Sequence, residues 1–265
     1  MKIGVVGATG RMGRMVIKQV HETAGCELVG AVNRPTAAEL GHDVGVLAGV
    51  GALGVKLGND AAALFKAAEV VIDFTVPAAT LAHLKLAAEH NCNMVIGTTG
   101  LTAEHDGAFA AAAQKVAIMQ APNMSAGVVL LTALAEQVAR TLGEEYDIEV
   151  LEMHHRHKID APSGTALALG AAAAKGRGID LKAQAIRARD GHTGARPPGA
   201  IGFATLRGGD VVGDHSVILA TDGERIELTH KAQSRVIYAA GAVRAALWLA
   251  GKQPGRYTMR DVLGI

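Results

Sequence analysis

Short apolar runs alternate with amphipathic stretches over the first half of the chain. Ile3, Val5 and Val6 form the first apolar run, which stops at Gly7, and apolar residues then recur at helical spacing until Gly25. The same succession predicts strands over 27–32, 70–74, 93–96 and 116–119 and helices over 77–90, 102–115 and 126–142. Near-continuous apolar strands separated by helices are typical of a parallel sheet covered on both faces. We therefore expect a doubly wound α/β domain.

After residue 142 the pattern changes to longer strands joined by short turns. Strands are predicted over 145–153, 201–206, 211–220 and 224–230, and helices over 166–175 and 235–250. Gly208-Gly209 and Asp222-Gly223 supply the turns between the last three strands. Because short connections favour antiparallel neighbours, we expect a second α+β domain with a mixed, largely antiparallel sheet.

Glycine is concentrated where predicted strands and helices end. The segment Gly7-Ala8-Thr9-Gly10-Arg11-Met12-Gly13 joins the first strand to the first helix, with the spacing G-x-x-G-x-x-G. Glycine allows a sharp turn there and lets backbone N–H groups approach a pyrophosphate at the positive end of the helix. With 33 glycines in the chain such a triplet also arises by chance. The strand before it and the helix after it favour a Rossmann-type dinucleotide site.

The second strand leads into Asn33, at the position where an acid usually binds the adenine ribose of NAD. An amide still hydrogen-bonds a ribose hydroxyl, but it does not repel a 2′-phosphate. Arg34 beside it can pair with that phosphate, unless it is an ordinary solvated arginine. We therefore expect NADPH to be accepted at least as well as NADH.

Two later loops follow strands of the same predicted sheet. Gly97-Thr98-Thr99-Gly100 comes after the strand that ends at Ile96, and Ala121-Pro122-Asn123-Met124 after the strand over 116–119. Ligands of open α/β sheets lie beyond the carboxyl ends of the strands, so both loops are candidates for the nicotinamide side. Helix capping is the alternative role for their threonine and asparagine residues.

Composition excludes several other classes of protein. The net charge is +1, and the chain has one tryptophan, three tyrosines and four phenylalanines. Neither a basic field nor a set of stacking rings is therefore present for nucleic acid. The two cysteines, Cys26 and Cys92, cannot form a disulfide framework, which fits a reducing, cytoplasmic setting. No apolar run reaches the ~18–20 residues of a membrane span, and we expect no secretory signal.

A histidine–lysine segment supplies candidate chemistry. His154-His155-Arg156-His157-Lys158 follows the strand over 145–153 and precedes Ala161-Pro162-Ser163-Gly164-Thr165. A metal site is one interpretation, but the fixed charges of the arginine and lysine disfavour it, and we expect no metal. Histidine titrates near pH 6.5 and donates a proton at neutral pH, while lysine adds a cation. The N–H groups of the helix that begins after Ser163 suit a carboxylate, so we expect a small acidic substrate.

These motifs resemble those of the 4-hydroxy-tetrahydrodipicolinate reductase family, also called dihydrodipicolinate reductase. The glycine-rich turn, Gly97–Gly100 and the segment from His154 to Thr165 carry the resemblance, which continues through Gly191–Gly194, 201–205 and 228–232. It therefore spans nearly the whole chain. The family reduces a cyclic dicarboxylate with NADH or NADPH on the diaminopimelate route to lysine.

The resemblance implies a role for each matching residue. His154 is implied as the proton donor and acceptor, Lys158 as a second proton donor, and His155, Gly164 and Thr165 as substrate contacts. The implied cofactor residues are Gly7, Ala8, Thr9, Gly10, Arg11, Met12, Asn33, Arg34, Gly97, Thr98, Thr99, Ala121, Pro122, Asn123 and Met124. Asn33 departs from the family, in which a carboxylate is familiar, and this puts a strong preference for NADH in doubt.

The resemblance also implies an organisation. Residues 1–125 with 235–265 would form the dinucleotide-binding domain, and 126–234 a substrate-binding domain that assembles a homotetramer. Two other functions fit parts of the pattern. Another nicotinamide-dependent amino-acid dehydrogenase would share the first half but not the histidine–lysine segment, and a non-catalytic nucleotide sensor would have lost its proton donors.

Overall fold

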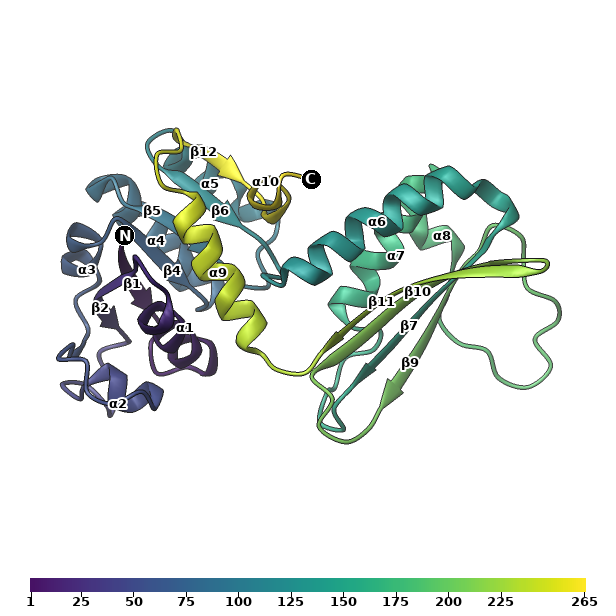
Figure 1. Ribbon diagram of the computed structural model, residues 1–265. Helices are drawn as coiled ribbons and strands as arrows, with labels where there is room; N and C mark the ends of the chain where they lie inside the picture. The colour runs from purple at the N-terminus through teal and green to yellow at the C-terminus, as the bar shows by residue number, and fades with distance from the viewer. The chain divides into compact units, whose positions relative to one another are not determined.

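The computed structural model describes every residue from Met1 to Ile265. The chain divides into two compact units (Figure 1). Met1–Ser125 and Val236–Gly264 form the first unit, and Ala126–Arg235 form the second. The first unit is therefore discontinuous in sequence.

The first unit contains a seven-stranded sheet in the order β12-β6-β5-β4-β1-β2-β3, with every neighbouring pair parallel. Its strands are β1 (Lys2–Val6), β2 (Glu27–Val32), β3 (Leu57–Gly58), β4 (Val70–Asp73), β5 (Asn93–Ile96), β6 (Ala117–Gln120) and β12 (Gly255–Tyr257). Counted outward from β3, the first six follow the order of dinucleotide-binding folds, which reverses direction between β1 and β4. The expected Rossmann-type parallel sheet is therefore confirmed.

Helices cover both faces of this sheet, as its apolar strands require. They are α1 (Arg11–Glu22), α2 (Val44–Ala48), α3 (Ala61–Ala67), α4 (Pro77–His90), α5 (Asp106–Ala113), α9 (Val236–Trp248) and α10 (Met259–Leu263), with a short 3₁₀ turn at Ala103–His105. Helix α1 packs against α9 on one face, and α3, α4 and α5 pack in succession on the other (Figure 1). None of the helices combines the length and the apolar character needed to cross a bilayer.

The second unit contains a five-stranded sheet in the order β11-β10-β7-β9-β8. Its elements are α6 (Ala126–Leu142), β7 (Asp147–His154), α7 (Gly164–Arg177), α8 (Leu181–Gln184), β8 (Ala185–Ile186), β9 (Ile201–Arg207), β10 (Gly213–Thr221) and β11 (Glu224–Ala232), with a 3₁₀ turn at Gly143–Glu145. Two strand pairs are antiparallel and two are parallel, so the sheet is mixed as expected. Helices α6 and α7 pack together and cover one face (Figure 1).

One expected pairing in this sheet is wrong. The turn at Gly208-Gly209 predicts β9 and β10 as antiparallel neighbours, but β7 lies between them. The link crosses the end of β7 instead, because its backbone bonds to the histidine segment: the Gly208 amide donates to the His154 carbonyl at 3.0 Å, and the His155 amide to the Val211 carbonyl at 2.7 Å. This crossing fixes the backbone on which the histidine–lysine segment begins.

Candidate active site

A cleft of about 780 Å³ lies at the carboxyl ends of β1, β2 and β4 in the first unit. Its walls come from the glycine-rich turn, the segment after β2 and the segment that begins α4. They include Gly7, Thr9, Gly10, Asn33, Arg34, Phe74, Thr75 and His83. Open α/β sheets bind dinucleotides where the strand order reverses, which here is between β1 and β4. The cleft therefore occupies the place that this fold provides for a nucleotide.

The glycine-rich turn is shaped for close approach by a ligand. Gly7 has a φ of +66°, which favours glycine. Gly10 precedes α1 and supplies no side-chain acceptor to its first N–H groups. A Cβ atom on Gly13 would lie 2.3 Å from the Gly7 carbonyl oxygen, so helix and turn pack backbone to backbone. These features fit the pyrophosphate of NADH or NADPH at the helix N-terminus.

The side chain of Asn33 is hydrogen-bonded within the protein, whereas the side chain of Arg34 is exposed at the cleft. The Asn33 side chain donates a hydrogen bond to Thr9 Oγ1 and accepts one from the Arg34 amide at 2.8 Å. The amide of Asn33 thus connects β2 to the glycine-rich turn. Arg34 is exposed and lines the cleft.

The other expected cofactor residues lie near the same edge without lining this cleft. Gly97–Thr99 follow β5, and Ala121–Met124 follow β6. Ala8 and Met124 are 2% and 1% exposed, so both residues are buried in the core. Arg11 is exposed and opens α1, and Met12 is half-buried.

A buried carboxylate joins the cleft to the loop after β5. Asp73, at the end of β4, accepts hydrogen bonds from the hydroxyls of Thr75 at 2.6 Å, Thr80 at 3.0 Å and Thr98 at 3.3 Å. His83 Nδ1 lies 2.8 Å from Asp73 Oδ2, the oxygen to which Thr80 also donates. Burial alone would raise the pKa of Asp73, but these donors lower it below its usual value. The ionised carboxylate therefore holds α4 and the Gly97–Thr99 loop in register.

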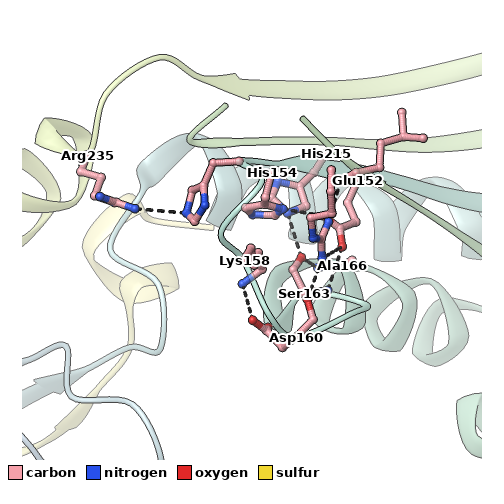
Figure 2. Close-up of polar contacts among 11 residues, drawn as sticks. Glu152, His154, Lys158, Asp160, Ser163, Ala166, His215 and Arg235 are labelled. Atoms are coloured by element: carbon pink, nitrogen blue, oxygen red, sulfur yellow. Dashed lines mark hydrogen bonds and ion pairs between the residues drawn. The ribbon is translucent and has the colours of Figure 1, made fainter. Parts of the chain in front are cut away.

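In the second unit, His154 ends β7 with its ring against a buried glutamate. His154 Nδ1 lies 2.5 Å from Glu152 Oε2, and the two residues are 8% and 1% exposed (Figure 2). Arg207 of β9 donates to both oxygens of Glu152, at 2.9 and 3.0 Å. Alternation along β7 places Glu152 and His154 on the same face of the sheet.

Glu152 is also hydrogen-bonded to the residue that precedes α7. The Ser163 amide donates to Glu152 Oε1 at 3.1 Å, and Ser163 Oγ accepts from the Ala166 amide at 3.1 Å as the helix cap. Ser163 Oγ also lies 3.1 Å from His215 Nε2 (Figure 2). Gly164 and Thr165, the expected substrate contacts, are the first two residues of this helix. His154 and the N-cap residue of α7 therefore both contact the Glu152 carboxylate.

Lys158 and His155 border this group. Lys158 Nζ forms an ion pair with Asp160 Oδ1 at 2.8 Å, on the loop that leads to Ser163 (Figure 2). His155 Nε2 lies 3.4 Å from a guanidinium nitrogen of Arg235, which adds a second cation to the second unit's site (Figure 2). Cations and a helix N-terminus together suit a ligand with more than one carboxylate.

Burial lowers the pKa of both buried histidines. It lowers the pKa of His154 below its usual value, although the hydrogen bond to Glu152 acts in the opposite direction. Burial lowers the pKa of His215 to about 4, so this ring is neutral at pH 7. For Glu152, burial raises the pKa, but Arg207 and His154 outweigh it and the carboxyl stays ionised.

Glu152, His154 and His215 also bring potential metal-ligand atoms within 4.8 Å of one another. Both Glu152 oxygens already accept from Arg207, whose positive charge lies beside them. A divalent cation would have to displace that guanidinium. The donor set therefore fits an acid–base group better than a metal centre, and the expectation of no metal stays a prediction.

Sequence reasoning missed several members of this site. Glu152, Arg207, His215 and Arg235 are not among the site residues that the sequence predicts. One signal was present for Glu152: Ile148, Val150, Glu152 and His154 recur with a period of two, which places the acid on the buried face. Nothing local in the sequence brings β9 or β10 to that face.

Comparison with known proteins covers the whole chain. The family model "Dihydrodipicolinate reductase, N-terminus" matches residues 1–124, and "Dihydrodipicolinate reductase, C-terminus" matches residues 127–263. The chain is 55% identical over 266 residues to "4-hydroxy-tetrahydrodipicolinate reductase 1" of Mesorhizobium japonicum, and 56% identical over 265 residues to the 4-hydroxy-tetrahydrodipicolinate reductase of Rhodopseudomonas palustris. Each alignment covers 100% of this chain and 97% of the relative.

A solved structure shares the fold. The dipicolinate-bound dihydrodipicolinate reductase from Paenisporosarcina sp. TG-14 superposes with a TM-score of 0.78 at 22% identity, over 98% of each chain. The family resemblance, the fold class and the nicotinamide cofactor expected from the sequence are confirmed. The chain belongs to the 4-hydroxy-tetrahydrodipicolinate reductase family of NAD(P)H-dependent oxidoreductases.

Proposed function

We propose that this chain reduces 4-hydroxy-tetrahydrodipicolinate to tetrahydrodipicolinate for lysine and diaminopimelate biosynthesis, with the site residues that the family motifs mark. The substrate is a small cyclic dicarboxylate. The names of the relatives and the dipicolinate bound to the solved structure support this substrate class. The net reaction replaces the ring hydroxyl by hydrogen and releases water.

The first unit, Met1–Ser125 with Val236–Gly264, serves as the dinucleotide-binding domain in this proposal. The glycine-rich turn Gly7–Met12 holds the pyrophosphate, while Asn33 and Arg34 meet the adenosine. The loops Gly97–Thr99 and Ala121–Met124 meet the nicotinamide. When bound, NADH or NADPH supplies the hydride. The cleft at the strand reversal supports this assignment.

The second unit, Ala126–Arg235, serves as the substrate domain. The amides of Gly164 and Thr165 at the start of α7 bind one carboxylate, and His155 contributes a further contact. Negative charge that develops on the substrate during reduction is stabilised by Lys158. Proton transfer then comes from the protonated His154 ring (imidazolium) or from the Lys158 ammonium.

One observation carries the proposal: His154 ends a strand with its Nδ1 at 2.5 Å from Glu152, and this same glutamate accepts from the residue that caps α7. An acid–base group is thus held beside an anion-binding helix end. A non-catalytic nucleotide sensor has no use for this pairing, and a general amino-acid dehydrogenase does not predict it.

The test is oxidation of NADPH, followed by absorbance, with substrate generated from pyruvate and aspartate semialdehyde. A well-placed proton donor contributes ~10²–10⁴-fold in rate. His154→Gln is expected to lower kcat by that order while leaving the Kd for NADPH within twofold. Absence of turnover by the unmodified protein would overturn the proposed function, and near-normal turnover by the variant would overturn the role of His154.

We also propose that the second unit assembles a homotetramer. Helices cover one face of its sheet, and the strand registers place Leu151, Met153, Ala204, Leu206 and Ile218 on the other. Leu206 is 47% exposed, and a second copy of the chain would bury this face. Light scattering is expected to give four chains for the unmodified protein and fewer for Leu206→Glu.

The reaction is proposed to take place in the cytoplasm. Cys26 and Cys92 are both free thiols, as in a reducing compartment. Detection of the enzyme in the cytosolic fraction of fractionated cells is the expected result.

A further inference from the structure

Glu152 is a buried acid that lies two residues before the histidine–lysine segment. It is 1% exposed and lies in the middle of the second unit's sheet, on β7. A carboxylate in that place is costly unless each of its lone pairs finds a donor. Four donors reach it: both terminal nitrogens of Arg207, the Ser163 amide and His154 Nδ1.

The arrangement determines which nitrogen of His154 holds a proton. An ionised carboxylate only accepts hydrogen bonds, so Nδ1 of His154 must donate to it. Neutral His154 therefore has its proton on Nδ1 and a free lone pair on Nε2. Nε2 lies beside the backbone of β10, where a Cβ atom on Gly213 would come within 3.0 Å of it. Glycine at that position leaves room next to the nitrogen that exchanges protons.

We propose that Glu152 is the positioning residue of this site: clamped by Arg207, it fixes the tautomer and ring orientation of His154 and holds the first turn of α7 at the same time. This inference rests on the proposed function, in which His154 transfers the proton. Glu152 itself touches no substrate in this scheme. It acts through His154, as the carboxylate does in other carboxylate–histidine pairs.

The titratable and charged groups that face His154 come from every element around it. They are Glu152 on β7, Arg207 on β9, His215 on β10 and Lys158 on the following loop. Only Glu152 is an anion, and its contact is the one that raises the pKa of His154 against burial and the neighbouring cations. Glu152→Gln is therefore expected to move the His154 titration to lower pH.

The first measurement uses the unmodified protein with ¹⁵N-labelled histidine. The His154 signals are assigned by their absence from the spectrum of His154→Gln. The expected result is the Nδ1–H tautomer of neutral His154. The Nε2–H tautomer would overturn the proposal, and this measurement needs neither a substrate nor a folded Glu152 variant.

The second measurement separates positioning from a merely structural role. Glu152→Gln is expected to lower kcat by about 10- to 100-fold in the unmodified background. In the His154→Gln background the same change is expected to lower kcat by less than threefold, since the group through which Glu152 acts is already missing. An equal loss of activity in both backgrounds, or an unchanged titration of His154, would refute the inference.

Glu136→Gln is the matched control. Glu136 is also buried and paired with two cations, Arg140 at 2.9 Å and Lys175 at 3.0 Å. Lys175 lies twelve residues beyond Ser163 along α7, which is about 18 Å at the rise of an α-helix. The control is expected to leave the His154 titration and kcat within twofold. If the unmodified protein shows no turnover, the proposed function fails, while the tautomer measurement still decides the pairing of Glu152 with His154.

Discussion

Replacing Gly13 by alanine tests whether helix α1 and the glycine-rich turn form the nucleotide site through their close contact. A Cβ atom at Gly13 would lie 2.3 Å from the Gly7 carbonyl oxygen and 2.8 Å from two backbone atoms of Ala8. Because non-bonded atoms pack at about 3.5–4.0 Å, helix and turn would have to separate by about 1 Å. Rotation of a side chain cannot relieve this overlap, since all three neighbours are backbone atoms.

Two opposing effects determine how much Gly13→Ala changes the unfolding free energy. Overpacking costs about 1–3 kcal/mol in unfolding free energy, and alanine regains up to about 1 kcal/mol of helix propensity over glycine. Displaced amides also fit the pyrophosphate less well, and a loss of about 1.4–2.8 kcal/mol there raises the Kd for NADPH by about 10- to 100-fold. Calorimetric titration with NADPH measures this change, and denaturant unfolding measures the stability.

Gly107→Ala in α5 is the matched control, because nothing lies within 4 Å of the Cβ position there. It is expected to leave the Kd for NADPH within twofold and to stabilise the protein slightly. If Gly13→Ala binds NADPH as tightly as this control, the glycine-rich turn is not the pyrophosphate site and the reasoning from backbone contact is refuted.

Three further outcomes follow from the same structure. Arg34→Ala is expected to weaken NADPH binding more than NADH binding, because the exposed guanidinium is placed for a 2′-phosphate; an unchanged ratio of the two Kd values would exclude that role. Asp73→Asn is expected to lower the unfolding free energy by about 1–3 kcal/mol in denaturant titrations, since an amide cannot accept from all the donors now bonded to the carboxylate. His215 has a pKa lowered to about 4 by burial, so unfolding takes up a proton between about pH 6.5 and 4, and stability should fall by at most about 3 kcal/mol as the pH drops through that window. His215→Asn should flatten the pH dependence of the unfolding free energy there, and an unchanged slope would contradict the assignment.

The elements that sequence reasoning placed well have strong local signals. Helix α4 begins at Pro77, whose missing N–H suits the first turn, and it ends before Asn91, which has a φ of 53°. Strand β5 and helices α4 and α6 have the predicted bounds, because apolar periodicity and turn residues agree there. The neighbours of β9 were predicted from the length of a connection, which says nothing about a strand inserted from elsewhere in the chain.

Among the site residues too, those with a local sequence signal were predicted and those brought in by distant strands were not. His154, Lys158 and the start of α7 stand close together in sequence, so their pattern predicts a common role. Arg207 comes from a strand more than fifty residues away, and only the parallel pairing of β7 with β9 brings it to Glu152. Long-range strand pairing therefore decides which charges surround His154, and local sequence does not encode this pairing.

The discontinuity of the first unit has a consequence for synthesis of the chain. Helix α9 covers part of the sheet through its contacts with α1, β4 and β5, and β12 completes the edge beside β6. Both elements follow the whole second unit in sequence, so a ribosome adding roughly 5–20 residues per second reaches α9 on the order of ten seconds after Ser125. Until then the face of the sheet that α1 covers lacks its second helix, while the second unit already has all its strands. The nucleotide-binding unit is therefore the last to complete its core, after the whole second unit, His154 included, has been synthesised.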